Sequence, residues 1–225
     1  MDGEGKPAAA ASALSRDHGY IQRNPASAYW ALSPYLIHQH TDSSCSLATA
    51  TMLLNGMRAI DGTGRMGRFF SERGLIDAID DPHWLKEITP LEGNGISFLD
   101  LAEKLRRILP LYDFTHWAVD SRAVRGVSAE AIADFRAELT AMERDGDRLL
   151  AANYHLATTY GDQWDIGHFS PVGAYDAATD RVLLLDVWKA DYEPSWVDLT
   201  RLMQGMATIS PITNNVRGYL IIRRT

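Results

Sequence analysis

Cys45 is the only cysteine among the 225 residues of this sequence, and its position favours nucleophilic chemistry. It lies where the polar segment 39–44 gives way to apolar residues at helical spacing. A thiol at a helix start meets unpaired backbone N–H groups and the positive end of the helix dipole, which favour the thiolate. The alternative is a structural role, because free cysteines are often buried as small hydrophobic side chains.

His168 and Asp186 could supply the base and the carboxylate that a cysteine nucleophile requires. They lie in two strand-like segments on either side of a turn at 176–180. If that turn is a five-residue connection, His168 faces Trp188 and Asp186 is its diagonal neighbour on the same face. An imidazole that accepts a thiol proton needs a carboxylate to fix its tautomer and stabilise the imidazolium. Taken alone, each residue also fits a structural role, as a strand-end histidine or a turn-capping aspartate.

The order of helical and strand-like segments predicts an α+β fold. The second expected helix starts at Ser97, carries Asp100 at the capping-box position and stops at Pro110. The other helices are expected at 43–59, 128–144 and 199–206, and the strands at 149–154, 168–175, 181–187 and 216–223.

The composition excludes several classes of function. A net charge of −7 without a basic run disfavours nucleic-acid binding. No apolar stretch is long enough for a membrane span, and a single cysteine allows neither an internal disulfide nor a multi-cysteine metal site. His38 and His40 have alternating spacing but no apparent third ligand nearby, so we expect no metal site and no cofactor. These features indicate a cytoplasmic protein.

The chain reads as one domain preceded by an extension. Residues 1–19 are mostly small or polar without an apolar period, so we expect an extension without regular structure. Residues 20–225 are expected to form the catalytic domain.

Short motifs are distributed from about residue 20 to the end of the chain. They are Asn24-Pro25-Ala26-Ser27-Ala28-Tyr29-Trp30, the stretch 39–47 followed by Leu54-Asn55, Gly95-Ile96-Ser97-Phe98, Gly167-His168-Phe169-Ser170-Pro171-Val172-Gly173, Val182-Leu183-Leu184-Leu185-Asp186-Val187, Pro194-Ser195-Trp196-Val197 and Arg217-Gly218-Tyr219. Together they resemble the catalytic domain of phytochelatin synthases. The Gly-His-Phe-Ser-Pro and Leu-Asp-Val runs at this spacing are the most specific part of the resemblance.

The resemblance implies a papain-like fold and a role for each matching residue. Cys45 would be the nucleophile, His168 the general base and acid, and Asp186 the orienting carboxylate. Gln39 would donate to the oxyanion together with the backbone N–H of Cys45.

The resemblance also implies a thiol-peptide substrate such as glutathione. Arg217 matches an arginine that would bind the α-carboxylate of the γ-glutamyl group through a bidentate contact. Ser210 stands where an acidic partner for the α-amino group is expected, which predicts an unpaired ammonium. Lys189 replaces a common arginine, Asp191 replaces a common lysine, and Tyr192 belongs to the same predicted substrate-binding set.

The implied function is that of a cysteine acyltransferase or peptidase acting on the carboxyl side of a γ-Glu-Cys unit. It would form a thioester on Cys45, release glycine and pass the acyl group to water or to an amine. Ser44, Ser210 and Asp191 motivate an alternative, a transacylase of a biosynthetic pathway that takes its acyl group from a carrier-protein thioester. The sequence leaves a homodimer open.

Overall fold

Several of the helices form where apolar side chains recur at helical spacing behind a capping side chain. In the computed structural model, which describes residues 11–63, 69–89, 93–189 and 191–225, the predicted Ser97/Asp100 capping box begins α6 (Phe98–Leu111). The predicted stop at Pro110 is wrong by one residue, because a proline in the last turn removes only its own N–H from the helix. The remaining helices are α1 (Gly19–Arg23), α2 (Ser27–Leu32), the 3₁₀ turn η1 (Ser33–Tyr35), α3 (Cys45–Ile60), α4 (Glu72–Ile79), α5 (Pro82–Glu87), α7 (Ala129–Asp145), α8 (Leu156–Tyr160) and α9 (Leu199–Met206).

The strands of the described residues form one seven-stranded antiparallel sheet in the order β1-β6-β5-β4-β3-β7-β2. They are β1 (Ala11–Ala13), β2 (Trp117–Ala123), β3 (Arg148–His155), β4 (Gly167–Asp176), β5 (Arg181–Leu184), β6 (Ser195–Asp198) and β7 (Gly218–Arg224). The central strands β3, β4 and β5 are buried along nearly their whole length. The predicted α+β class is confirmed.

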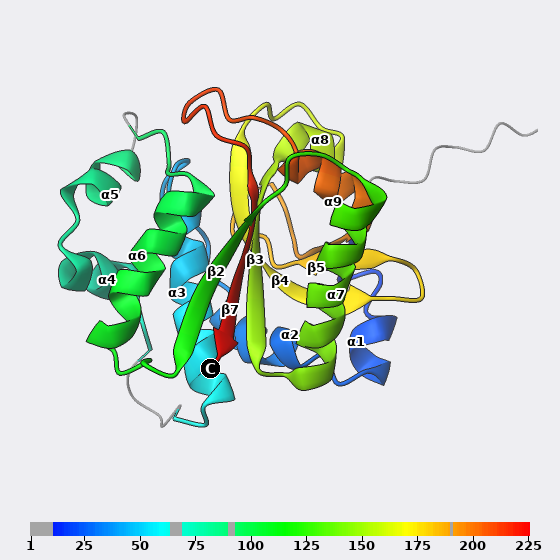
Figure 1. Ribbon diagram of the computed structural model, residues 1–225, viewed down its shortest axis with the longest axis horizontal. Coiled ribbons are helices and arrows are strands. Elements are labelled where there is room, and N and C mark those ends of the chain that lie inside the picture. Colours follow the sequence, from blue (N-terminus) through cyan, green and yellow to red (C-terminus); the bar gives the residue numbers. More distant parts are fainter. Residues whose placement is uncertain (1–10, 64–68, 90–92, 190) are drawn as a thin grey trace, which may run out of the picture.

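The helices pack on the sheet as two groups. Figure 1 shows α4, α5 and α6 to the left of the sheet and α7 and α9 to its right. The largely buried helix α3 packs against β4 and β3, whereas α6 packs on β2 and β7. One continuous apolar core joins these layers. The packing of α3 on β4 brings the start of the helix close to one end of the central strands.

The hairpin of β4 and β5 differs from the prediction. Asp176 pairs with Arg181, so the connection is four residues long, and the register shifts between Val172 and Ala174. The strand ends at Leu184 rather than continuing to residue 187. A β-bulge adds an unpaired residue and bends its strand, which sequence alternation does not reveal. Val172 pairs with Leu184, which is the register that would place His168 opposite Trp188, but β5 ends there, so the predicted pair lies beyond the ladder, with its rings 6.2 Å apart.

The predicted extension without regular structure is wrong for residues 11–19, and residues 1–10 lie outside the described part of the chain. β1 extends the sheet by pairing with β6. Asp17 forms an ion pair with Arg181 at 2.7 Å, and its carbonyl accepts a hydrogen bond from the indole of Trp196. Pairing with an existing sheet edge orders a segment that has no apolar period of its own.

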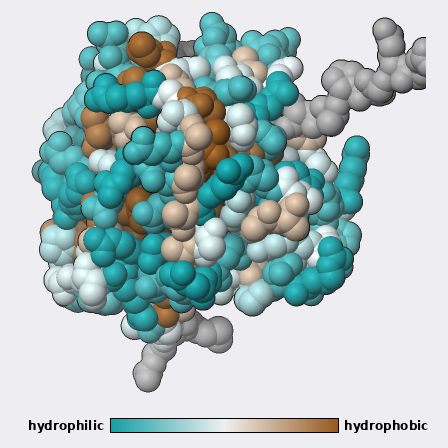
Figure 2. Space-filling view, turned by 45° about the vertical axis from the view of Figure 1, so that its right-hand side comes forward, coloured by the Kyte–Doolittle hydropathy of each residue, from teal (hydrophilic) through white to brown (hydrophobic). Residues whose placement is uncertain are grey.

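The face of the molecule in Figure 2 is mostly hydrophilic, with small apolar patches between the polar side chains. Among the described residues, no helix is long and apolar enough to cross a membrane.

Candidate active site

Cys45 is the first residue of α3, two residues after the helix start predicted at 43. It follows the N-cap position Ser44 and is 8% exposed. Its side chain reaches the wall of a cavity of about 290 Å³, formed by loops that precede α3, α6, β4 and β7. A small molecule in this cavity could therefore contact the only cysteine of the chain.

His168 lies at the start of β4 and forms a buried pair with Asp186. The Nε2–Oδ1 distance is 2.9 Å, and the two side chains are 2% and 0% exposed. The Cys45 side chain lies near the same ring and also contributes to raising the pKa of His168. Because Asp186 occupies Nε2, the nitrogen left for Cys45 is Nδ1. Cys45, His168 and Asp186 thus lie in a row, with the imidazole between thiol and carboxylate.

Charge interactions dominate the protonation of this pair. Burial by itself would lower the pKa of His168, but the negative charge and hydrogen bond of Asp186, with smaller contributions from Cys45, raise it to about 10. Burial would likewise raise the pKa of Asp186, but His168 and the other donors around the carboxylate hold it below its usual range. The geometry therefore favours an imidazolium facing a carboxylate.

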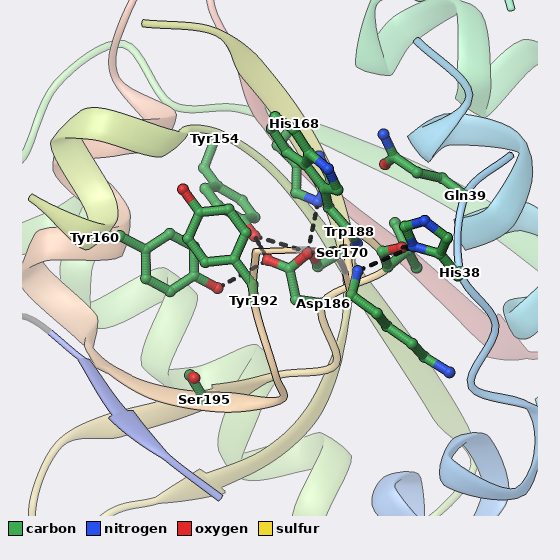
Figure 3. Close-up of polar contacts among 12 residues, drawn as sticks. His38, Gln39, Tyr154, Tyr160, His168, Ser170, Asp186, Trp188, Tyr192 and Ser195 are labelled. Carbon is green, nitrogen blue, oxygen red and sulfur yellow. Dashed lines mark hydrogen bonds and ion pairs between the residues drawn. The ribbon is translucent and has the colours of Figure 1, made fainter. Parts of the chain in front are cut away.

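Asp186 is fixed by four hydrogen bonds, drawn in Figure 3. Besides His168, the donors are the backbone N–H of Trp188 at 2.8 Å and the hydroxyls of Tyr154 and Tyr160, each at 3.0 Å. Burial raises the pKa values of both tyrosines well above their usual range, so their hydroxyls remain donors. Sequence reasoning missed both tyrosines. Tyr154 could have been noticed in the predicted strand 149–154, whereas Tyr160 lies outside every predicted element.

Gln39 lies on the other side of His168 from the tyrosines, as Figure 3 shows. Its backbone N–H donates to the Val187 carbonyl at 2.9 Å and its Nε2 donates to the Thr41 carbonyl at 3.0 Å. The side chain is 2% exposed, and Oε1 has no hydrogen-bond partner among the described residues. One of the two amide hydrogens is thus engaged, which leaves the second for another acceptor.

Two of the four predicted substrate-binding residues, Arg217 and Ser210, line the cavity beside Cys45. Arg217 is 3% exposed, and its Nη1 donates to the Thr208 hydroxyl at 2.6 Å. Burial lowers the pKa of Arg217, partly offset by the charge of Asp165. Among the described residues, no carboxylate forms an ion pair with this guanidinium.

Lys189 and Tyr192 lie elsewhere and do not line this cavity. The Lys189 ammonium donates to the Leu36 carbonyl at 2.9 Å. Tyr192 stacks on Tyr160 and donates to Asp162.

The two histidines considered as metal ligands have separate partners. His38 Nδ1 lies 3.1 Å from the Lys189 N–H and 3.2 Å from the Val187 carbonyl. His40 pairs with the buried Glu72 at 2.8 Å. Among the described residues, no group of three or more metal-ligating side chains comes together.

The fold and this site together define the class of the protein. A cysteine at the start of a buried helix, facing a histidine of an antiparallel sheet, is the arrangement of papain-like proteins. The chain belongs to the phytochelatin synthase family, whose model matches residues 17–219.

Curated relatives agree with this assignment. The chain is 31% identical over 198 residues to "Glutathione gamma-glutamylcysteinyltransferase 3" of Lotus japonicus, covering 87% of this chain and 37% of the relative. It is 30% identical over 208 residues to "Glutathione gamma-glutamylcysteinyltransferase 1" of Triticum aestivum, covering 91% and 37%. The match to "Glutathione gamma-glutamylcysteinyltransferase" of Schizosaccharomyces pombe is 23% over 195 residues, covering 86% and 43%. The chain therefore spans less than half the length of each of these relatives.

Proposed function

We propose that this chain is a cysteine acyltransferase or hydrolase that takes a γ-glutamylcysteinyl group from glutathione or a related γ-Glu-Cys donor. The observation that carries the proposal is the Cys45–His168–Asp186 row beside a cavity whose wall contains Arg217. The names of the relatives supply the donor chemistry.

Acylation begins when the Cys45 sulfur attacks the carbonyl carbon of the Cys-Gly peptide bond. A tetrahedral oxyanion forms, and the backbone N–H of Cys45 and the second amide hydrogen of Gln39 stabilise it. The imidazolium of His168 then gives its proton to the departing glycine nitrogen, and the C–N bond breaks. A γ-glutamylcysteinyl thioester remains on Cys45. Asp186 keeps the ring oriented throughout, because its four hydrogen bonds fix the carboxylate.

Deacylation repeats these roles with a new nucleophile. Neutral His168 takes a proton from water or an amine, the nucleophile attacks the thioester carbonyl, and the Cys45 thiolate departs. Water yields γ-glutamylcysteine, whereas the amine of a second thiol peptide yields a longer peptide. The acceptor is therefore decided by which nucleophile reaches the thioester.

A second candidate keeps the same three residues but changes the donor to a carrier-protein thioester. It is favoured by Ser210 and Asp191, which replace charged residues expected in the family pattern. The apolar side chains at the cavity rim, Ile166 and Ile212, would accept such a donor without a γ-glutamyl group. In either case we place the protein in the cytoplasm and leave open that it acts as a homodimer.

Glycine release tests the proposal. The wild-type protein incubated with glutathione should release glycine in amounts above the enzyme concentration, and Cys45→Ala should release none. A control is Asp77→Asn, an exposed substitution on α4 outside the cavity wall, which should keep glycine release. Turnover of an acyl carrier thioester with no release from glutathione would favour the second candidate instead.

A further inference from the structure

One wall of the Cys45 cavity combines a buried cation with an exposed carboxylate. Arg217 and Asp165 both line the cavity, and the Asp165 side chain is 95% exposed. The Arg217 guanidinium packs on Gly167, where an added Cβ would lie 3.0 Å from Nε and from Nη2. Gly167 is two residues from Asp165, and the charge of Asp165 raises the pKa of Arg217 against the effect of burial. The two opposite charges are therefore close enough to act on one ligand.

The carboxylate of Asp165 is held in place rather than left to move freely. His155 Nε2 lies 2.8 Å from its Oδ1, and His155 Nδ1 lies 2.9 Å from the Thr158 hydroxyl. His155 itself ends the buried strand β3. The carboxylate thus has one partner at the end of β3 and keeps an exposed oxygen for a further partner.

Ser210 is neutral, and its hydrogen bonds lie within the loop that precedes β7. Its N–H donates to the Asn215 carbonyl at 2.9 Å, and its Oγ accepts from the Thr213 N–H at 3.3 Å. It lines the cavity but offers no negative charge. An acidic partner for a cationic ligand group must therefore come from another residue of the wall.

We propose that Asp165 pairs with the α-ammonium of the acyl donor while Arg217 pairs with its α-carboxylate, so that the two residues select an α-amino-acid head group. This inference rests on the proposed function and replaces the sequence prediction of an unpaired ammonium. An ammonium and a carboxylate on one carbon match a cation and an anion on one wall. The other acid of the wall, Asp42, is three residues from Cys45 and thus close to the reacting carbonyl, whereas the head group is the far end of the donor.

The test compares glutathione with N-glutaryl-cysteinyl-glycine, which lacks only the α-amine. Glycine release gives kcat/KM for both donors with the same readout. Wild type should prefer glutathione by about tenfold, the expected effect of one hydrogen bond to a charged group. Asp165→Asn should lose this preference by slowing on glutathione alone, and Asp165→Asn/Ser210→Asp should regain part of it. Asp77→Asn removes an exposed charge outside the cavity wall and should behave as wild type.

Two results would overturn the inference. An unchanged preference in Asp165→Asn would exclude Asp165, and loss of the preference in Asp42→Asn would assign the ammonium to Asp42. If neither donor releases glycine, the proposed function is wrong. Ligand binding then tests separately whether Asp165 recognises the α-ammonium. Calorimetry with Cys45→Ala should show tighter binding of γ-glutamylcysteine than of N-glutaryl-cysteine, and the difference should vanish when Asp165→Asn is added.

Discussion

His168 and Asp186 are almost completely buried, and buried charges are costly unless they are paired and hydrogen-bonded. Four donors offset this cost at Asp186, two of them from Tyr154 and Tyr160. Removing one side chain of this network therefore leaves the remaining buried groups without a partner. We expect the residues of the row to act as a unit rather than as independent contributors.

Double substitutions should reveal that unit. His168→Ala should lower kcat/KM for glycine release by about 10³-fold or more, nearly as much as Cys45→Ala, because no proton reaches the leaving amine. Asp186→Asn should leave more activity, because the ring loses orientation but not its proton-transfer function. Cys45→Ala/His168→Ala should be no worse than either single variant. Penalties that simply add, or normal turnover by folded His168→Gln, would refute the assignment.

The protonation of His168 should appear in the pH dependence of stability. Its folded pKa, about 10, exceeds the unfolded value near 6.5, so its proton stabilises the folded chain fully below pH 6.5 and this contribution disappears as the pH rises to 10. The lowered pKa of Asp186 contributes above about pH 4 and is lost as the pH falls further. The stability advantage of wild type over Asp186→Asn should therefore be level between about pH 4 and 6.5 and decline towards pH 10.

Denaturant unfolding at a series of pH values measures this difference. Asp77→Asn, which removes an exposed partner of Arg73, should show no such decline between pH 6.5 and 10. If the difference in unfolding free energy between wild type and Asp186→Asn stays constant up to pH 10, the raised pKa of His168 is contradicted.

At the scale of elements, the helices were predictable because their signals are local. The apolar spacing gave the start of α3 at Cys45 within two residues, and the Ser97/Asp100 capping box marked the start of α6. The helix α9 was predicted with its bounds as observed. Each of these signals depends on neighbours within one or two turns of the same helix.

The sheet was predicted less well because strand pairing depends on residues far apart in the chain. The pairing next to the turn is shifted by one residue, but the bulge at Val172–Ala174 restores the predicted register, and Val172 pairs with Leu184. His168 and Asp186 meet beyond the end of β5 at Leu184. The strands β1 and β6 are three and four residues long, which is too short for a clear alternation of apolar and polar side chains. The sequence around Asp165 contains no motif that predicts its place in the cavity wall, because that place depends on how distant segments pack.

Gly218 connects the sheet to the substrate cavity, because it follows Arg217 at the start of β7. A Cβ there would lie 2.0 Å from the carbonyl oxygen of Arg122 on β2, which is backbone and cannot move aside cheaply. Gly218→Ala should therefore destabilise the fold by about 1–3 kcal/mol and raise KM for glutathione by displacing Arg217. Thermal unfolding and steady-state glycine release measure the two effects. At Gly126 nothing lies within 4 Å of an added Cβ, so Gly126→Ala is the matched control and should change neither.

At the scale of the whole molecule, the site exists only because two parts of the chain pack together. The helix α3 brings Cys45, and the sheet brings His168 on β4 with Asp186 just beyond β5. The contact of α3 with β4 sets their separation. The family match over residues 17–219 includes all of these parts, although the chain spans only 37% of the length of the Lotus japonicus and Triticum aestivum relatives. The described chain thus contains all three residues of the proposed row.

Intact-mass analysis tests the central claim most directly. Wild-type protein quenched in acid shortly after mixing with glutathione should gain the mass of one γ-glutamylcysteinyl group, because a thioester on Cys45 survives at low pH. Asp186→Asn should gain the same mass more slowly, and Cys45→Ala should gain none. Equal acylation of Cys45→Ala, or no added mass on a wild type that releases glycine in a rapid burst, would contradict a covalent intermediate on Cys45.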